Sequence, residues 1–141
     1  QWHLSRGWTD IGYHVVVENG YPTYAAWAAR KLVESRIGRV MSGRPYEKTP
    51  AAVLGHNTGM IGICLIGNFS VAGPDPLGKQ WINAVDAVAR LCLRHGLAYH
   101  QVKGHREYSG HESNECPGRY FYIKPFRQAV AARMAELKDG E

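Results

Sequence analysis

The chain has 141 residues, of which 45% are hydrophobic and 21% charged, with 16 glycines and a formal net charge of +5 at pH 7. These values exclude collagen-like, coiled-coil and disordered proteins and suit one soluble, loop-rich domain. The apolar stretches are far shorter than the ~20 residues that span a bilayer, which disfavours a membrane-spanning protein.

The first half of the chain predicts two strands and a long loop. Residues 12–18 (GYHVVVE) are apolar and β-branched and end at an Asn-Gly turn, as a strand does. Residues 21–38 are bounded by Pro22 and Gly38 and suit a short helix or structured insertion. Residues 39–41 predict a small strand, and residues 42–59, with two prolines and three glycines, a loop.

The second half predicts two strands, two helices and a polar loop. Residues 60–67 (MIGICLIG) are apolar at nearly every position, which favours a strand buried on both faces. Apolar residues at helical spacing predict helices over residues 75–95 and 123–137. Residues 99–102 predict a brief strand and residues 105–118 a loop. We therefore expect an α/β fold in which helices pack on both faces of a central mixed β-sheet.

The charge and the cysteines limit the partners and the compartment. A basic surface suits a polyanion: nucleic acid, anionic lipid or an acidic cell-wall polymer. No run of Lys and Arg exceeds two residues, which disfavours nucleic acid. Cys64, Cys92 and Cys116 are widely spaced and odd in number, so we expect no disulfide framework and a reducing compartment, with Cys64 and Cys92 buried.

The N-terminus carries no initiator methionine. The chain opens Gln1-Trp2-His3, its first methionine is Met41, and its first residues do not read as the apolar segment of a signal peptide. We expect a processed chain or a fragment of a longer one.

A histidine and a cysteine offer metal-ligand chemistry. His105 follows a predicted strand, and Cys116 lies eleven residues later, directly before a Pro-Gly turn. Zn²⁺ takes imidazole and thiolate ligands, and a catalytic site keeps three protein ligands and one open position for water. The alternative is an exposed histidine and an inert cysteine.

Four short motifs occur together in one order along the chain. They are GYH at 12–14, GHN at 55–57, GHRE at 104–107 and CPG at 116–118, and WH at 2–3 and RGWTDI at 6–11 extend the pattern. In this order the chain resembles the zinc-dependent N-acetylmuramoyl-L-alanine amidases, the family of phage lysozyme-type amidases and peptidoglycan recognition proteins. The resemblance covers most of a single domain over residues 1–141, with residues 21–38 as an insertion.

The resemblance implies roles for particular residues. His105 and Cys116 correspond to two zinc ligands, and Tyr13 to the tyrosine whose hydroxyl lies near the zinc-bound water and the scissile carbonyl. His56 and Asn57 correspond to the region that lines the peptide groove. Exposed rim is the alternative for His56, and capping of a turn is the alternative for Asn57.

The chain departs from the family at three positions. The family's third zinc ligand is a histidine on an N-terminal strand that precedes the position of Trp2. Either the protein is longer than this chain, or another histidine completes the site, or the site is empty, and the candidate histidines are His3, His14 and His56. Of these, His14 alternates with Tyr13 on the strand, so a core histidine is the favoured interpretation. Two further residues differ from those common in the family: Asn114 stands in place of a lysine, where its amide remains a neutral donor for the oxyanion, and Ala52 in place of a histidine.

Several other residues are expected to be structural. Arg106 and Glu107 suit an ion pair or loop anchor, His111 a solvated loop, and Trp27 a core position.

The resemblance implies a zinc-dependent amidase that cleaves the bond between N-acetylmuramic acid and the L-alanine of the stem peptide. A phage or prophage endolysin of this kind is made in the host cytoplasm and reaches the cell-wall peptidoglycan at lysis. The alternatives are a peptidoglycan-binding module without catalysis, a regulatory protein that contacts phage RNA polymerase, and a zinc hydrolase acting on another amide.

Overall fold

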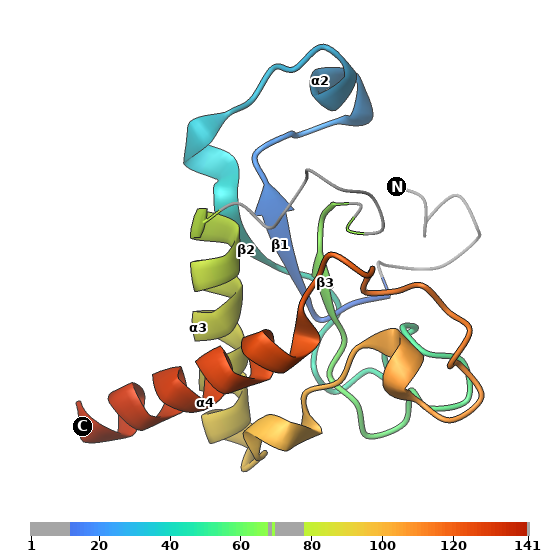
Figure 1. Cartoon of the computed structure of the whole chain (residues 1–141), viewed down its shortest axis with the longest axis vertical. Helices are drawn as coiled ribbons and strands as arrows, with labels where there is room; N and C mark the ends of the chain where they lie inside the picture. Colours follow the sequence, from blue (N-terminus) through green and yellow to red (C-terminus); the bar gives the residue numbers. More distant parts are fainter. Residues whose placement is uncertain (1–11, 68, 70–77, 141) are drawn as a thin grey trace. The chain divides into compact units, whose positions relative to one another are not determined.

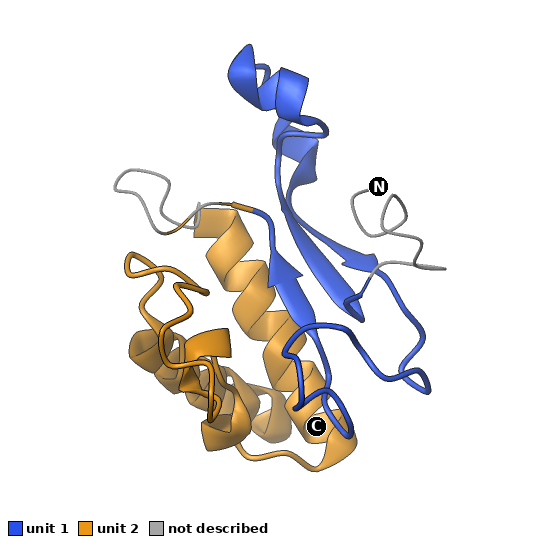
Figure 2. Ribbon diagram, turned by 90° about the vertical axis from the view of Figure 1, so that its right-hand side faces the viewer, with its two compact units in different colours: residues 1–66 blue, residues 67–141 orange. Residues whose placement is uncertain are grey.

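Three strands in the first half of the chain form one small mixed sheet. The computed structural model describes residues 12–67, 69 and 78–140, and it divides into two compact units, residues 1–66 and 67–141 (Figure 2). In the first unit β1 (Val15–Asn19) lies between β2 (Ile37–Ser42) and β3 (Ile63–Leu65) (Figure 1). β1 runs antiparallel to β2 and parallel to β3, so the predicted mixed sheet is confirmed.

An acidic side chain is buried in β1 where the strand register is irregular. Val15 and Val17 are buried on one face, but the register shifts between Val17 and Asn19, and Glu18 is buried as well. Its carboxylate accepts hydrogen bonds from Arg36 at 2.5 Å and Arg39 at 2.6 Å. Burial by itself would raise the pKa of Glu18, but the hydrogen bonds and charges of the two arginines together hold that pKa below its ordinary value.

The segment after β1 contains a short helix, as predicted for residues 21–38. Gly20 has φ +95°, and a Cβ there would lie 2.7 Å from side-chain carbons of Leu32 and Ile37, so only glycine suits this turn. α2 (Tyr24–Ala28) follows, and η1 (Glu34–Arg36) precedes β2. The core position expected for Trp27 is wrong: the side chain is on a five-residue helix with no buried residue and is 53% exposed.

Two long helices form much of the described part of the second unit. α3 (Gly78–His95) presents buried side chains at helical spacing, including Ala84, Val88 and Cys92, and α4 (Ile123–Asp139) packs on it. Four aromatic rings of the second unit pack against one another in tilted or edge-on pairs, with centroids 5.2–5.6 Å apart: Phe69, Trp81, Phe121 and Phe126. No helix in the described part of the chain is long and apolar enough to cross a bilayer.

The structure differs from the sequence prediction at β3 and at residues 99–102, and it does not describe the predicted start of α3. β3 is half-buried throughout, so its burial on both faces was wrongly predicted, and Cys64 is half-buried with it. Residues 99–101 form the 3-10 helix η2 (Tyr99–Gln101) rather than a strand, because the Gln101 side chain accepts the Ala98 amide at 2.8 Å and closes a turn. The predicted start of α3 at residues 75–77 lies outside the described residues.

Candidate functional site

The two predicted zinc ligands lie together in the second unit. His105 begins the short helix η3 (His105–Glu107), and the backbone of His105 hydrogen-bonds the Cys116 thiol. The next amide, that of Arg106, donates to the Cys116 carbonyl at 3.1 Å. The histidine and the cysteine, eleven residues apart in sequence, are therefore held side by side by backbone contacts.

A glycine permits this close approach. A Cβ on Gly104 would lie 2.7 Å from Cδ of Pro117, well inside ordinary van der Waals contact. The backbone before His105 thus packs directly on the proline after Cys116.

Polar side chains fix both ends of the loop. Glu107 accepts the Gly104 amide at 2.8 Å and pairs with Arg127 of α4 at 2.6 Å. The expected role of Glu107 as a loop anchor is confirmed, although its partner is Arg127 rather than Arg106. At the other end Asn114 Oδ1 accepts the Cys116 amide at 2.9 Å.

His105 has a second imidazole beside it. Its Nε2 lies 2.9 Å from Nδ1 of His111, and the ring centroids are 4.8 Å apart. Burial, and secondly the charge of His111, lower the pKa of His105, which favours the neutral form that binds metals. Sequence reasoning placed His111 in a solvated loop, and the only signal for its role was a second histidine six residues after the first.

Opposing effects act on the pKa of the Cys116 thiol. Desolvation raises its pKa, whereas the hydrogen bond from the His105 backbone and the charge of Arg106 act in the opposite direction. The net effect favours the protonated thiol, so a metal ion would displace its proton on binding.

These donors suit zinc but do not complete a site by themselves. Imidazole and thiolate are the ligands zinc prefers, so His105 and Cys116 fit two of its positions. Within residues 12–67, 69 and 78–140 no three His, Cys, Asp or Glu side chains form a metal-binding group. His3, one of the candidates for a third ligand, lies outside the described residues.

His14 is a core histidine, as expected. Its Nδ1 accepts the Gly62 amide at 3.0 Å and its Nε2 donates to the Lys48 carbonyl at 2.8 Å, and the residue is 2% exposed. Both ring nitrogens are used, so no lone pair of His14 remains for a metal.

The remaining predicted site residues lie in the first unit. Tyr13 is half-buried, and its ring packs against Gly62, where a Cβ would lie 3.4 Å from Cδ1. Asn57 Oδ1 accepts the amides of Ala52 at 2.9 Å and Val53 at 2.7 Å, which makes it the cap of its turn. His56 is half-buried. The contacts of Asn57 and His56 with substrate stay predictions, as does the catalytic role of Tyr13.

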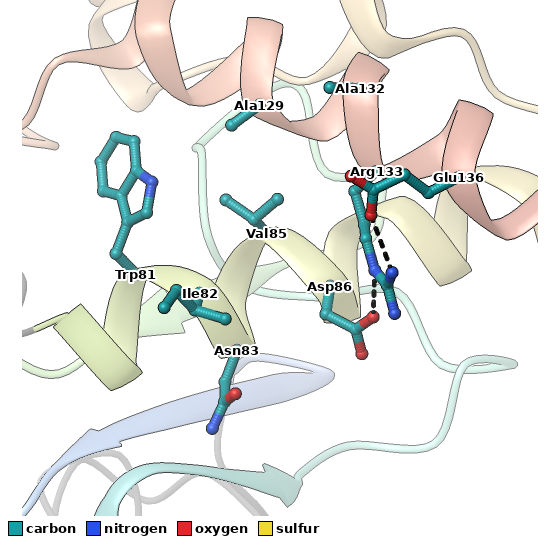
Figure 3. A pocket seen from close by; sticks show the side chains of 9 residues that line it. All are labelled: Trp81, Ile82, Asn83, Val85, Asp86, Ala129, Ala132, Arg133 and Glu136. Carbon is teal, nitrogen blue, oxygen red and sulfur yellow. Dashed lines mark hydrogen bonds and ion pairs between the residues drawn. The ribbon is translucent and has the colours of Figure 1, made fainter.

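A groove elsewhere in the second unit lacks this chemistry. It encloses about 600 Å³ between α3 and α4 (Figure 3). Its charged side chains are engaged with one another, since Arg133 pairs with Asp86 at 2.8 Å and with Glu136 at 2.9 Å. No histidine or cysteine lines it, so the candidate site remains the loop around His105.

A family model and several known proteins are similar to this chain in sequence. The family model described as N-acetylmuramoyl-L-alanine amidase matches residues 2–119. Endolysins of Klebsiella phage KP32 and Escherichia phage T7 are each 30% identical over 73 residues, which are 52% of this chain and 37% of theirs. A human N-acetylmuramoyl-L-alanine amidase is 28% identical over 116 residues, 81% of this chain and 16% of its own.

Solved structures agree on the fold. The amidase LysC from Clostridium intestinale URNW superposes with a TM-score of 0.70 at 22% identity, over 92% of this chain and 70% of that one. The predicted α/β, amidase-like fold is thereby confirmed. The chain spans only about a third of the length of the curated endolysins that it matches. Because the family model covers most of its residues, the chain belongs to the N-acetylmuramoyl-L-alanine amidase family.

Proposed function

We propose that this chain is a peptidoglycan amidase of the phage endolysin type, which hydrolyses the amide between N-acetylmuramic acid and the L-alanine of the stem peptide. Zinc would be held in part by His105 and Cys116. The single observation that carries the proposal is the contact between these two residues, which lie where the family resemblance assigns ligands. The family match and the endolysin relatives support it.

The chain's own residues have distinct roles in this proposal. Zinc, when bound, supplies a Lewis acid that polarises the scissile carbonyl and activates water. The Tyr13 hydroxyl donates to the carbonyl oxygen as negative charge develops there. Asn114 serves as a second, neutral donor through its amide nitrogen, because its Oδ1 is occupied by the Cys116 backbone. His56 and Asn57 bind the stem peptide.

The setting follows from the same proposal. The enzyme is made in the host cytoplasm and acts on the cell wall after release, as endolysins do. Its net charge of +5 favours encounter with an anionic envelope. No observation favours a contact with phage RNA polymerase, and we do not propose one.

A peptidoglycan-binding module without catalysis is the second candidate. It is favoured by Asn114, which lacks the charge of the lysine common at this position. The binding module differs from the amidase in one outcome: it would bind the stem peptide without cleaving it from the peptidoglycan.

Zinc content and product release test the proposal together. Wild-type protein is dialysed against metal-free buffer, analysed for zinc, and then incubated with purified sacculi. We expect about one zinc per chain and release of stem peptide with a free L-alanine amino group. Cys116→Ala should lose both, whereas the control Cys64→Ala, which changes a half-buried cysteine of β3, should keep both.

Each result separates the candidates. Sacculus binding without release would favour the non-catalytic module. Wild-type release by Cys116→Ala would overturn the ligand assignment. Activity on a small amide but none on sacculi would indicate a zinc hydrolase with another substrate.

A further inference from the structure

We infer that His111 is a positioning residue for the metal site: it accepts a hydrogen bond from Nε2–H of His105 and so leaves Nδ1 of His105 as the ligating atom. The inference rests on the proposed zinc function. It assigns a role to a residue that the family motifs do not include.

The contact geometry is that of a hydrogen bond. The 2.9 Å between His105 Nε2 and His111 Nδ1 is the ordinary length for a nitrogen donor and acceptor. One of the two nitrogens must carry the proton, because two facing lone pairs would repel each other. Two nitrogens bound to one tetrahedral zinc would instead be separated by about 3.3 Å, given bonds of 2.0–2.1 Å.

The other nitrogen of His105 is available. No hydrogen bond engages its Nδ1 anywhere in the part of the chain that the structure describes. When a zinc ion takes the Nδ1 lone pair, the proton must reside on Nε2, where His111 accepts it. The hydrogen bond and the metal therefore select the same tautomer of His105.

The loop backbone holds His111 at this place. Its amide donates to the Tyr108 carbonyl at 3.0 Å, and its carbonyl accepts the Asn114 amide at 2.9 Å. Gly110, with φ +83°, turns the chain immediately before it. Both backbone groups of His111 are thus bonded within the loop that joins the two ligands, and the side chain is half-buried.

Three variants test the inference. His111→Ala removes the acceptor, His111→Asn restores an acceptor atom at the position of Nδ1, and His100→Ala is the control, an exposed histidine on η2. The first measurement is the tautomer of His105 in metal-free protein, from long-range ¹H–¹⁵N correlations in mildly alkaline buffer. We expect Nε2–H in the wild type, in His111→Asn and in the control, and a mixture of tautomers in His111→Ala.

The second measurement is zinc affinity, by competition with a chromogenic chelator. Loss of an outer-shell partner weakens metal binding about 10–100-fold, so we expect this loss in His111→Ala, recovery to within a few-fold in His111→Asn, and no change in the control. The visible spectrum of the Co²⁺-substituted protein should keep its band positions in all variants, because no ligand is removed.

Other results would overturn the inference. Equal zinc affinity in the wild type and His111→Ala would remove the positioning role. A Co²⁺ spectrum altered in both His111 variants would make His111 a direct ligand. A wild type with the Nε2–H tautomer but no affinity for zinc would refute the proposed function while leaving the hydrogen bond in place.

Discussion

The packing of Gly104 on Pro117 makes a sharp prediction, because it can be perturbed by a single methyl group. In Gly104→Ala the new Cβ would lie 2.7 Å from Cδ of the proline and 3.1 Å from Cγ. Ordinary contacts begin near 3.4 Å, so the two backbone segments must separate by about 0.7 Å. Gly104 has φ −77°, which alanine adopts freely, so the effect is steric and not conformational.

The magnitude follows from overpacking. Forced displacement in a packed site costs about 1–3 kcal/mol. For a chain of this length each kcal/mol lowers Tm by about 3–4 °C, so thermal unfolding should report a loss of roughly 3–12 °C. Because the displaced segments carry His105 and Cys116, zinc affinity should fall as well.

The control is Gly78→Ala, a glycine at the start of α3 with nothing within 4 Å of its Cβ position. It should be neutral or more stable by about 0.5–1 kcal/mol, as alanine favours a helix. Unchanged Tm and zinc affinity in Gly104→Ala would refute the close packing of the two segments that carry His105 and Cys116.

Three further substitutions have defined outcomes. His14→Phe should lower the free energy of unfolding by about 2–4 kcal/mol in denaturant titration, since it strands a buried amide and a carbonyl, yet zinc content of the folded protein should not change. Glu18→Gln should make the stability of the protein depend less steeply on pH in the acid range. Because the pKa of Glu18 is lowered in the folded state, the charged carboxylate adds stability at pH values above its ordinary pKa of 4.5, and this stability is lost as pH falls through the folded-state pKa. A wild-type curve of unfolding free energy against pH that is no steeper than that of the variant would contradict this. Tyr13→Phe should retain zinc and lower turnover on sacculi about 100-fold, and full turnover would remove the hydroxyl from the mechanism.

The sequence predicted those parts of the fold in which one local pattern determines the outcome. A β-branched apolar run indicated β1, and helical spacing indicated α3 and α4. A His and a Cys flanking a polar loop indicated that His105 and Cys116 could approach each other, as they do, whereas their role as zinc ligands stays a prediction. The alternation of Tyr13 and His14 also predicted correctly which of the two is buried.

The errors arise where tertiary context decides. β-forming residues suggested a strand at residues 99–102, but the hydrogen bond from the Ala98 amide to the Gln101 side chain favours a tight turn. Apolar composition in β3 does not specify how completely its neighbours cover it, and Trp27 is exposed because α2 is too short to bury a face. The role of His111 depends on loop geometry, which carries no periodic signal.

The anchoring of the loop at both ends has a consequence for chain entropy. The ion pair between Glu107 and Arg127 fixes one end of the loop, and the hydrogen bond from the Cys116 amide to Asn114 fixes the other. The conformational entropy of ordering His105 and Cys116 is therefore lost when the second unit folds and not when a metal binds. Between these anchors, doubling the loop length would cost only about 0.6 kcal/mol of closure free energy. Insertions after Tyr108 should therefore leave His105 and Cys116 in place while moving His111 away from His105. Metal affinity could then be changed at this stretch without changing the fold.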